Sequence, residues 1–303
     1  MTTKIRRLKL GVTLTVVLSL AIVLLAPSFS AAGVACETGT GGTPLSVSDF
    51  SAIPQSVVDD AARLATELFG DYQQECDAFA SQLLATYLKA KDKDFIMVFN
   101  PGGWGWNLLE TSPEWRSIFD GIKSELNSSG YTSLLLDYQR TTDSWRGCFG
   151  ELVEMMTGYP SKAQDLALRV GFLTNHIPDL RVILAGESTG TIISDRAMNI
   201  LRGNPQVYSI QTGPPFWHKS TVLDRTLVMT SNGVTPDSFS RGDFFTIVCV
   251  NLEALFGFSQ AEDEAGRVLL YVGSPGHEYW WQYPGVYSQI TSFLNKNFGI
   301  KWR

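Results

Sequence analysis

The alternation of short apolar runs with amphipathic stretches constrains the fold of this chain more than any other feature. Short runs rich in Ile, Leu and Val, without polar alternation, are typical of strands buried on both faces. Strands that alternate with helices predict a mostly parallel sheet with helices on both of its faces, an α/β fold. We expect strands at 95–99, 131–138, 181–185, 206–211, 225–230 and 267–272, and helices at 112–130, 143–158, 161–177, 189–202, 244–256 and 287–298.

A helical region precedes the first expected strand. Apolar residues in 54–91 recur at spacings of three and four, which is typical of amphipathic helices, and Gly70-Asp71 interrupts the pattern. Residues 36–53 are polar and rich in glycine, which favours a linker. We therefore expect a domain at 54–303 with a helical N-terminal part at 54–91.

The first 35 residues have the pattern of a membrane-targeting segment. Four basic residues precede an apolar run at 10–26, and small residues at 30–32 would suit cleavage by signal peptidase. The run fits either a cleaved signal peptide or a retained single-pass anchor. In both cases the basic residues stay inside, so the domain is expected outside the cytoplasm, either secreted or anchored in the membrane.

Charge and cysteine content exclude several classes of function. Without the four basic residues of the N-terminus, 20 basic side chains stand against 30 acidic ones. Such a surface repels phosphate backbones, so we expect no nucleic-acid partner. The four cysteines and three histidines lack the spacing of metal ligands, so we expect no metal and no cofactor. Disulfides are permitted outside the cytoplasm, but the sequence leaves their pairing open.

The segment RVILAGESTG at 181–190 carries the clearest chemical motif. It is an expected strand, then G-x-S-x-G with Ser188 at its centre, then an expected helix. A tight turn between strand and helix crowds its neighbours and so favours the two glycines, and it lets a serine hydroxyl project outward. The amide of Thr189, at the start of the helix, is placed to stabilise an oxyanion.

A nucleophilic serine needs a base, and the three histidines differ in position. His176 ends an expected helix, and His218 lies in a loop, where we expect a structural role. His277 follows the last expected strand and precedes the last helix, so it is the expected base.

The acid that orients the base is expected after the strand at 225–230. Asp237 lies in a loop there, whereas Asp243 directly precedes a helix, where a helix cap explains it. We predict Asp237 and keep Asp243 as the alternative, with Asp137 as a weaker third choice.

The elbow GESTG, the order serine, acid, histidine, and the glycine-rich NPGGWG after an upstream strand resemble the α/β-hydrolase superfamily, and GESTG resembles the GESAG elbow of carboxylesterases. The resemblance covers about residues 95–303. It implies a Ser188–His277–Asp237 triad and oxyanion donors at Thr189 and at Gly103, or alternatively at Trp104. The sequence departs from the common HGGG loop, which has a histidine.

Tryptophans near the expected strand ends, among them Trp104 and Trp217, would fill either a core or an apolar substrate pocket. The expected function is that of a serine hydrolase, of carboxylesterase or lipase type, acting on a small or lipid-like ester. The alternatives are a membrane-tethered binding protein that retains the fold without catalysis, and a peptidase or acyltransferase with the same triad. The sequence does not specify the natural substrate or the oligomeric state.

Overall fold

The structure is a computed structural model that describes residues 52–103, 108–140, 145–221, 223–255 and 274–300. All of these belong to the unit Cys36–Arg303. The helices are α2 (Gln55–Phe69), α3 (Gln73–Ala90), α4 (Pro113–Ser128), α5 (Trp145–Thr157), α6 (Pro160–His176), α7 (Gly190–Ile200), α8 (Ser238–Arg241), α9 (Phe244–Leu255) and α10 (Pro284–Phe298), with a 3-10 turn η2 (Leu109–Thr111).

Five strands form one sheet in the order β2-β1-β3-β4-β5, and every pair is parallel. They are β1 (Phe95–Asn100), β2 (Ser133–Asp137), β3 (Arg181–Glu187), β4 (Val207–Thr212) and β5 (Thr226–Met229). The carboxyl ends of all five strands therefore meet at one edge of the sheet. The predicted parallel sheet with helices on both faces is confirmed.

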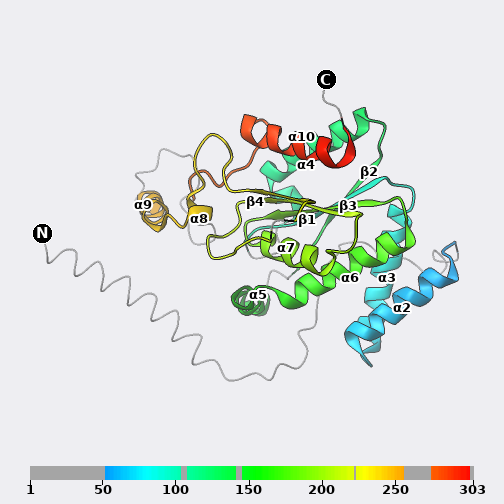
Figure 1. The fold of residues 1–303 in the computed structure, drawn as a ribbon. Coiled ribbons are helices and arrows are strands. Elements are labelled where there is room, and N and C mark those ends of the chain that lie inside the picture. Colours follow the sequence, from blue (N-terminus) through cyan, green and yellow to red (C-terminus); the bar gives the residue numbers. More distant parts are fainter. Residues whose placement is uncertain (1–51, 104–107, 141–144, 222, 256–273, 301–303) are drawn as a thin grey trace, which may run out of the picture. The chain divides into compact units, whose positions relative to one another are not determined.

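Two hydrophobic cores lie on opposite faces of the sheet, and β1 contributes to both. Phe95, Met97 and Phe99 pack with α4 and α10, whereas Ile96 and Val98 pack with α2, α3, α6 and α7. In Figure 1, α4 and α10 lie above the sheet and α6 and α7 below it. The absence of polar alternation in this strand thus reflects burial of both faces.

Most expected elements are present, with small shifts at their ends. The second strand begins at Ser133 rather than at residue 131. At the end of α4 the amide of Tyr131 bonds to the carbonyl of Leu126, and Gly130, at φ +85°, donates to Asn127. This closing turn of the helix holds Tyr131 out of the strand. The short helix α8 was not expected, and the predicted strand at 267–272 lies outside the described residues.

The predicted targeting segment and linker also lie outside the described residues, apart from residues 52 and 53 of the linker. Within the described ranges no helix is both long enough and apolar enough to span a membrane.

Candidate functional site

Ser188 lies in a strained turn at the carboxyl edge of the sheet, between β3 and α7. Its φ is +48°, and Tyr159 is the other non-glycine residue with positive φ in the described part of the chain. A serine pays a steric penalty in this region, so the surrounding contacts must hold it there. One of them is the hydrogen bond of 2.9 Å from the Ser188 amide to the carbonyl of Thr212, at the end of β4.

Both glycines of the motif allow neighbouring backbone segments to pack close to the serine turn. A Cβ atom on Gly186 would lie 2.8 Å from the Cα of Thr191, and one on Gly190 would lie 2.2 Å from the carbonyl oxygen of Asn100. Any larger residue would push the start of α7 away from β3 or from the loop after β1. The glycines therefore serve packing at this turn, and the serine itself adopts the unusual backbone angle.

His277 and Asp237 lie side by side beyond the ends of β4 and β5. The Nδ1 atom of His277 is 3.0 Å from Oδ2 of Asp237, and the carboxylate is fully buried while the ring is 23% exposed. Gly213, which follows β4, packs against both: a Cβ there would lie 2.4 Å from Cε1 of His277 and 3.2 Å from Oδ2 of Asp237. Because Gly213 directly follows Thr212, which accepts from Ser188, the pair lies next to the serine turn.

The Asp237 carboxylate has several donors. Oδ1 accepts from the amides of Phe239 and Ser240 and so caps α8, while Oδ2 accepts from the hydroxyls of Ser240 and Tyr279, the latter at 2.7 Å. Burial alone would raise the pKa of Asp237, but His277 and these donors outweigh it and lower the pKa below its usual value. Asp237 is therefore ionised at neutral pH.

The other acid candidates have different partners. Asp243 is exposed and accepts from the amide and the hydroxyl of Thr246, as an N-terminal cap of α9. Asp137, half-buried at the end of β2, accepts from the amide of Leu109 at 2.9 Å. Of the three carboxylates, Asp237 is the one that lies against His277.

The two remaining histidines pair with carboxylates elsewhere. His176, the last residue of α6, lies 2.9 Å from Asp60 of α2, and Nε2 of His218 lies 3.2 Å from Asp195 of α7. The amide of Thr221 also donates to Asp195, at 2.8 Å, so this carboxylate holds the loop after β4 against α7. Neither histidine contacts the serine turn through a hydrogen bond within the described residues.

The predicted donor loop after β1 lies against the serine turn. A Cβ on Gly102 would lie 3.1 Å from the Cβ of Ser188, and the Gly102 amide donates to Oε2 of Glu187 at 3.2 Å. Gly103, at φ +59°, is exposed, and its carbonyl accepts from Arg140 and from the hydroxyl of Thr189. The Thr189 amide donates no hydrogen bond to another described residue. Trp104 lies outside the described residues.

Glu187 is half-buried next to the serine. Burial raises the pKa of its carboxyl, as does nearby Glu114, while the Gly102 amide, His277 and Arg140 lower it; the pKa is raised overall. The residue links the loop after β1 to the end of β3.

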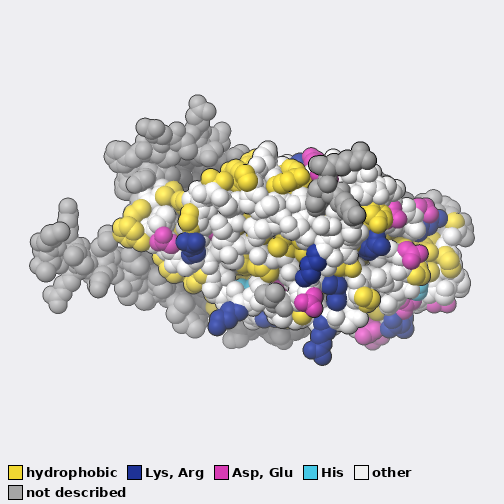
Figure 2. Space-filling view, turned by 45° about the horizontal axis from the view of Figure 1, so that its top comes forward, with side chains coloured by type: hydrophobic (Ala, Val, Ile, Leu, Met, Phe, Trp, Pro, Cys, Tyr) yellow, Lys and Arg dark blue, Asp and Glu magenta, His cyan; other side chains and the backbone are white. Residues whose placement is uncertain are grey.

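An aromatic series leads outward from His277. Phe239 stacks edge-on against the His277 ring at 5.0 Å between centroids, Trp217 against Phe239 at 5.4 Å, and Phe216 against both Trp217 and Phe244. Trp217 is 49% exposed, so the predicted substrate-binding tryptophan lies at the surface rather than in a core. In Figure 2, hydrophobic side chains gather at the left end of the coloured part of the molecule, over α8 and α9.

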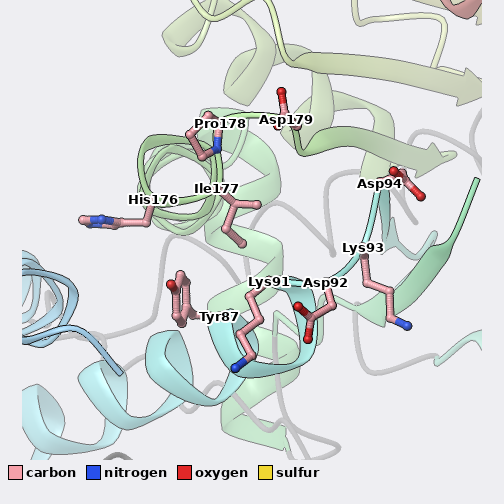
Figure 3. A pocket seen from close by; sticks show the side chains of 9 residues that line it. All are labelled: Tyr87, Lys91, Asp92, Lys93, Asp94, His176, Ile177, Pro178 and Asp179. Carbon is pink, nitrogen blue, oxygen red and sulfur yellow. The ribbon is translucent and has the colours of Figure 1, made fainter. Parts of the chain in front are cut away.

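A separate hollow lies at the opposite edge of the sheet, where the strands begin (Figure 3). It is lined by the ends of α3 and α6 and by the turn before β1, including Lys91, Asp94 and His176. None of the predicted site residues lines it. Within the described part of the chain no group of three His, Cys, Asp or Glu side chains is arranged to hold a metal ion.

Sequence reasoning missed Arg140, Tyr279 and the role of Glu187 as a link. A signal existed for Arg140, because polar residues just past the strands of a parallel sheet gather at its carboxyl edge. Tyr279, two residues after His277, carries no such signal: its partner is set by the path of the loop.

No protein-family model and no curated protein match the sequence. Among solved structures, the chain is similar to a Trichoderma reesei cutinase in complex with a C11Y4 phosphonate inhibitor, with 13% sequence identity and a TM-score of 0.32. The similarity covers 60% of this chain and 78% of the cutinase. The site described above therefore rests on the geometry of this chain alone.

Proposed function

We propose that this protein is a serine hydrolase of α/β-hydrolase type that cleaves carboxylic esters outside the cytoplasm. One arrangement carries the proposal: a serine at positive φ between a strand and a helix bonds to Thr212, and the next residue, Gly213, packs against a histidine that contacts a buried, ionised aspartate. A buried carboxylate against one ring nitrogen leaves the other nitrogen free to act as a base.

In the proposed reaction, Oγ of Ser188 attacks the acyl carbon of the ester while Nε2 of His277 takes the hydroxyl proton. Asp237 accepts the Nδ1–H bond, which fixes the ring tautomer and stabilises the imidazolium. The negative charge that develops on the carbonyl oxygen is stabilised by the amide of Thr189, at the positive end of the α7 dipole, and by the loop after β1.

The intermediate then collapses. The bond to the alcohol oxygen breaks, and His277 gives its proton to the leaving alcohol, so an acyl-enzyme on Ser188 remains. Water, deprotonated by His277, attacks the acyl-enzyme; the bond to Oγ of Ser188 then breaks, His277 returns the proton to Oγ, and the carboxylic acid leaves. A peptidase or an acyltransferase would differ in the leaving group or the acyl acceptor, not in these residues.

The aromatic series that begins at His277 supports an apolar acyl or aryl substrate. Phe239, which is half-buried, packs against the proposed base, and the exposed Trp217 packs against Phe239; such apolar surfaces favour ester groups with apolar substituents. The basic start of the chain followed by an apolar run supports delivery across a membrane, with the segment either cleaved or retained as an anchor.

The test is hydrolysis of a short-chain aryl ester by the wild-type protein and by Ser188→Ala and His277→Ala. Each substitution should lower kcat by about 10³-fold or more with the fold intact. His176→Ala is the matched control, since this histidine pairs with Asp60 in another part of the molecule. Near-wild-type turnover by Ser188→Ala would exclude the proposed mechanism, and a wild-type protein inactive on esters and amides would favour the non-catalytic binding alternative.

A further inference from the structure

Arg140 is a buried cation that the proposed reaction does not use directly. It follows β2 at the carboxyl edge of the sheet and is 1% exposed. Its Nε donates to Oε1 of Glu151 at 2.6 Å, and both groups are buried. A buried ion pair is a poor source of stability, because desolvation opposes the attraction between the charges. Its presence here therefore calls for another role.

The rest of the guanidinium connects the two segments that flank the proposed nucleophile. One terminal nitrogen donates to the carbonyl of Pro101, and the other donates to the carbonyl of Gly103 at 2.8 Å and to the hydroxyl of Thr189 at 3.2 Å. Thr189 in turn donates to the Gly103 carbonyl at 3.2 Å. A planar guanidinium with five N–H donors suits several acceptors in fixed directions, and an ammonium does not.

The orientation of the carbonyls has a consequence for the amides. In a planar trans peptide group the N–H points opposite to the C=O. With the Pro101 carbonyl turned toward Arg140, the Gly102 amide points away from it and donates to Glu187. Arg140 thereby fixes both the direction of this amide and the close approach of Gly102 to Ser188.

We propose that Arg140 is a positioning residue, which Glu151 holds in place and which sets the loop after β1 and the Thr189 turn at the spacing that stabilises the oxyanion. This inference rests on the proposed function and deepens it. Arg140 contacts backbone carbonyls and the Thr189 hydroxyl, and it acts on the reaction only through the loop it holds.

The main test is Arg140→Lys, which keeps the positive charge and removes the planar guanidinium with its fixed N–H directions. Because loss of one oxyanion donor lowers turnover by 10²–10³-fold, we expect kcat to fall by about 10²-fold, with KM for a short ester changed by less than about threefold. Arg169→Lys is the matched control: Arg169 pairs with Asp165 within α6, away from the serine turn, and its kcat should stay near wild type.

Two further variants separate positioning from folding. Arg140→Met combined with Glu151→Leu removes both charges together, which favours a folded protein; we expect it to retain the fold and lose kcat. Arg140→Ala should regain part of its kcat when guanidinium is added at millimolar concentration. Methylammonium should have no such effect, because only guanidinium has the planar arrangement of N–H donors that Arg140 supplies.

The outcomes distinguish the two proposals. If the wild-type protein is active through Ser188 but Arg140→Lys keeps its kcat, or if the double variant is folded and fully active, this inference is wrong and the proposed function stands. The inference is also wrong if the kcat loss merely follows the folded fraction. A wild-type protein without Ser188-dependent activity would overturn both.

Discussion

Substitution of Gly213 by alanine probes the predicted base without altering any residue of the proposed triad. Gly213 has φ +61°, and an added Cβ would lie 2.4 Å from Cε1 and 2.8 Å from Nδ1 of the His277 ring. Carbon atoms in van der Waals contact are separated by about 3.5 Å, so the ring has to move by about 1 Å. The positive φ adds a cost of about 1–2 kcal/mol to the folded state.

A displacement of this size matters for proton transfer. A misplacement of about 1 Å can lower turnover by about 10²-fold, because general-base catalysis depends on hydrogen-bond geometry. We therefore expect Gly213→Ala to fold, to have a lower melting temperature than the wild type, and to lose about 10²-fold in kcat on a short-chain aryl ester.

Gly130→Ala is the control for the backbone strain alone. Gly130 also has positive φ, +85°, and an added Cβ would meet no atom of the described residues within 4 Å. It precedes β2, at the edge of the sheet opposite to Ser188. The Gly130→Ala variant should be less stable than the wild type and keep its activity. If folded Gly213→Ala retained kcat within about threefold of the wild type, His277 would not be the base in the position described here.

The remaining predictions concern the carboxylates and the aromatic surface. Asp237→Asn should lower kcat by about 10²-fold or more. Because the buried Tyr279 hydroxyl loses its nearer acceptor (2.7 Å, against 3.3 Å to the carbonyl of Met229), the substitution should also lower the free energy of unfolding by about 1–3 kcal/mol. Asp243→Asn should cost about 1 kcal/mol or less as a weakened cap and stay active; the reverse pattern would make Asp243 the acid. Folding lowers the pKa of Asp237, so its ionised carboxylate stabilises the fold above pH about 3.9, and this contribution is lost as the pH falls below that value. The unfolding curves of the wild type and Asp237→Asn should therefore converge in acid. The pKa of Glu187 is raised, so its ionised carboxylate destabilises the fold. Glu187→Gln should therefore raise the melting temperature above pH about 4.3 and leave it unchanged well below that pH. Trp217→Ala should raise KM more for esters of long acyl chains than for acetates, and an equal effect on both would argue against a substrate-binding role.

The strands and the serine turn could be predicted because their signals are local. Buried runs such as 95–99 and 181–185 need no knowledge of the rest of the chain, and the spacing of glycine, serine and glycine reflects contacts within one turn. His277 was predicted from its place after the last expected strand, which depends on topology and on nothing else.

Other features depend on the path of loops, which no local pattern specifies. The sequence interpretation treated Asp243 as the helix cap and Asp237 as the loop acid, but in the structure both cap helices. Asp237 serves two roles because its two oxygens face different partners. The place of Arg140 just past an expected strand gave a signal, but its partners did not: two of its acceptors are backbone carbonyls of a distant segment, which leave no trace in side-chain identity.

Reaction with a fluorophosphonate tests the central claim most directly, since this probe forms a stable bond with a serine only where a base activates it. The wild-type protein, Ser188→Ala and His277→Ala would be incubated with the probe. Intact-mass spectrometry would detect the adduct, and proteolysis followed by peptide mapping would locate the modified residue. We predict one adduct on the wild-type protein, at Ser188, with no adduct on Ser188→Ala and much slower labelling of His277→Ala. An unlabelled wild-type protein, or labelling that survives in Ser188→Ala, would contradict the proposed nucleophile.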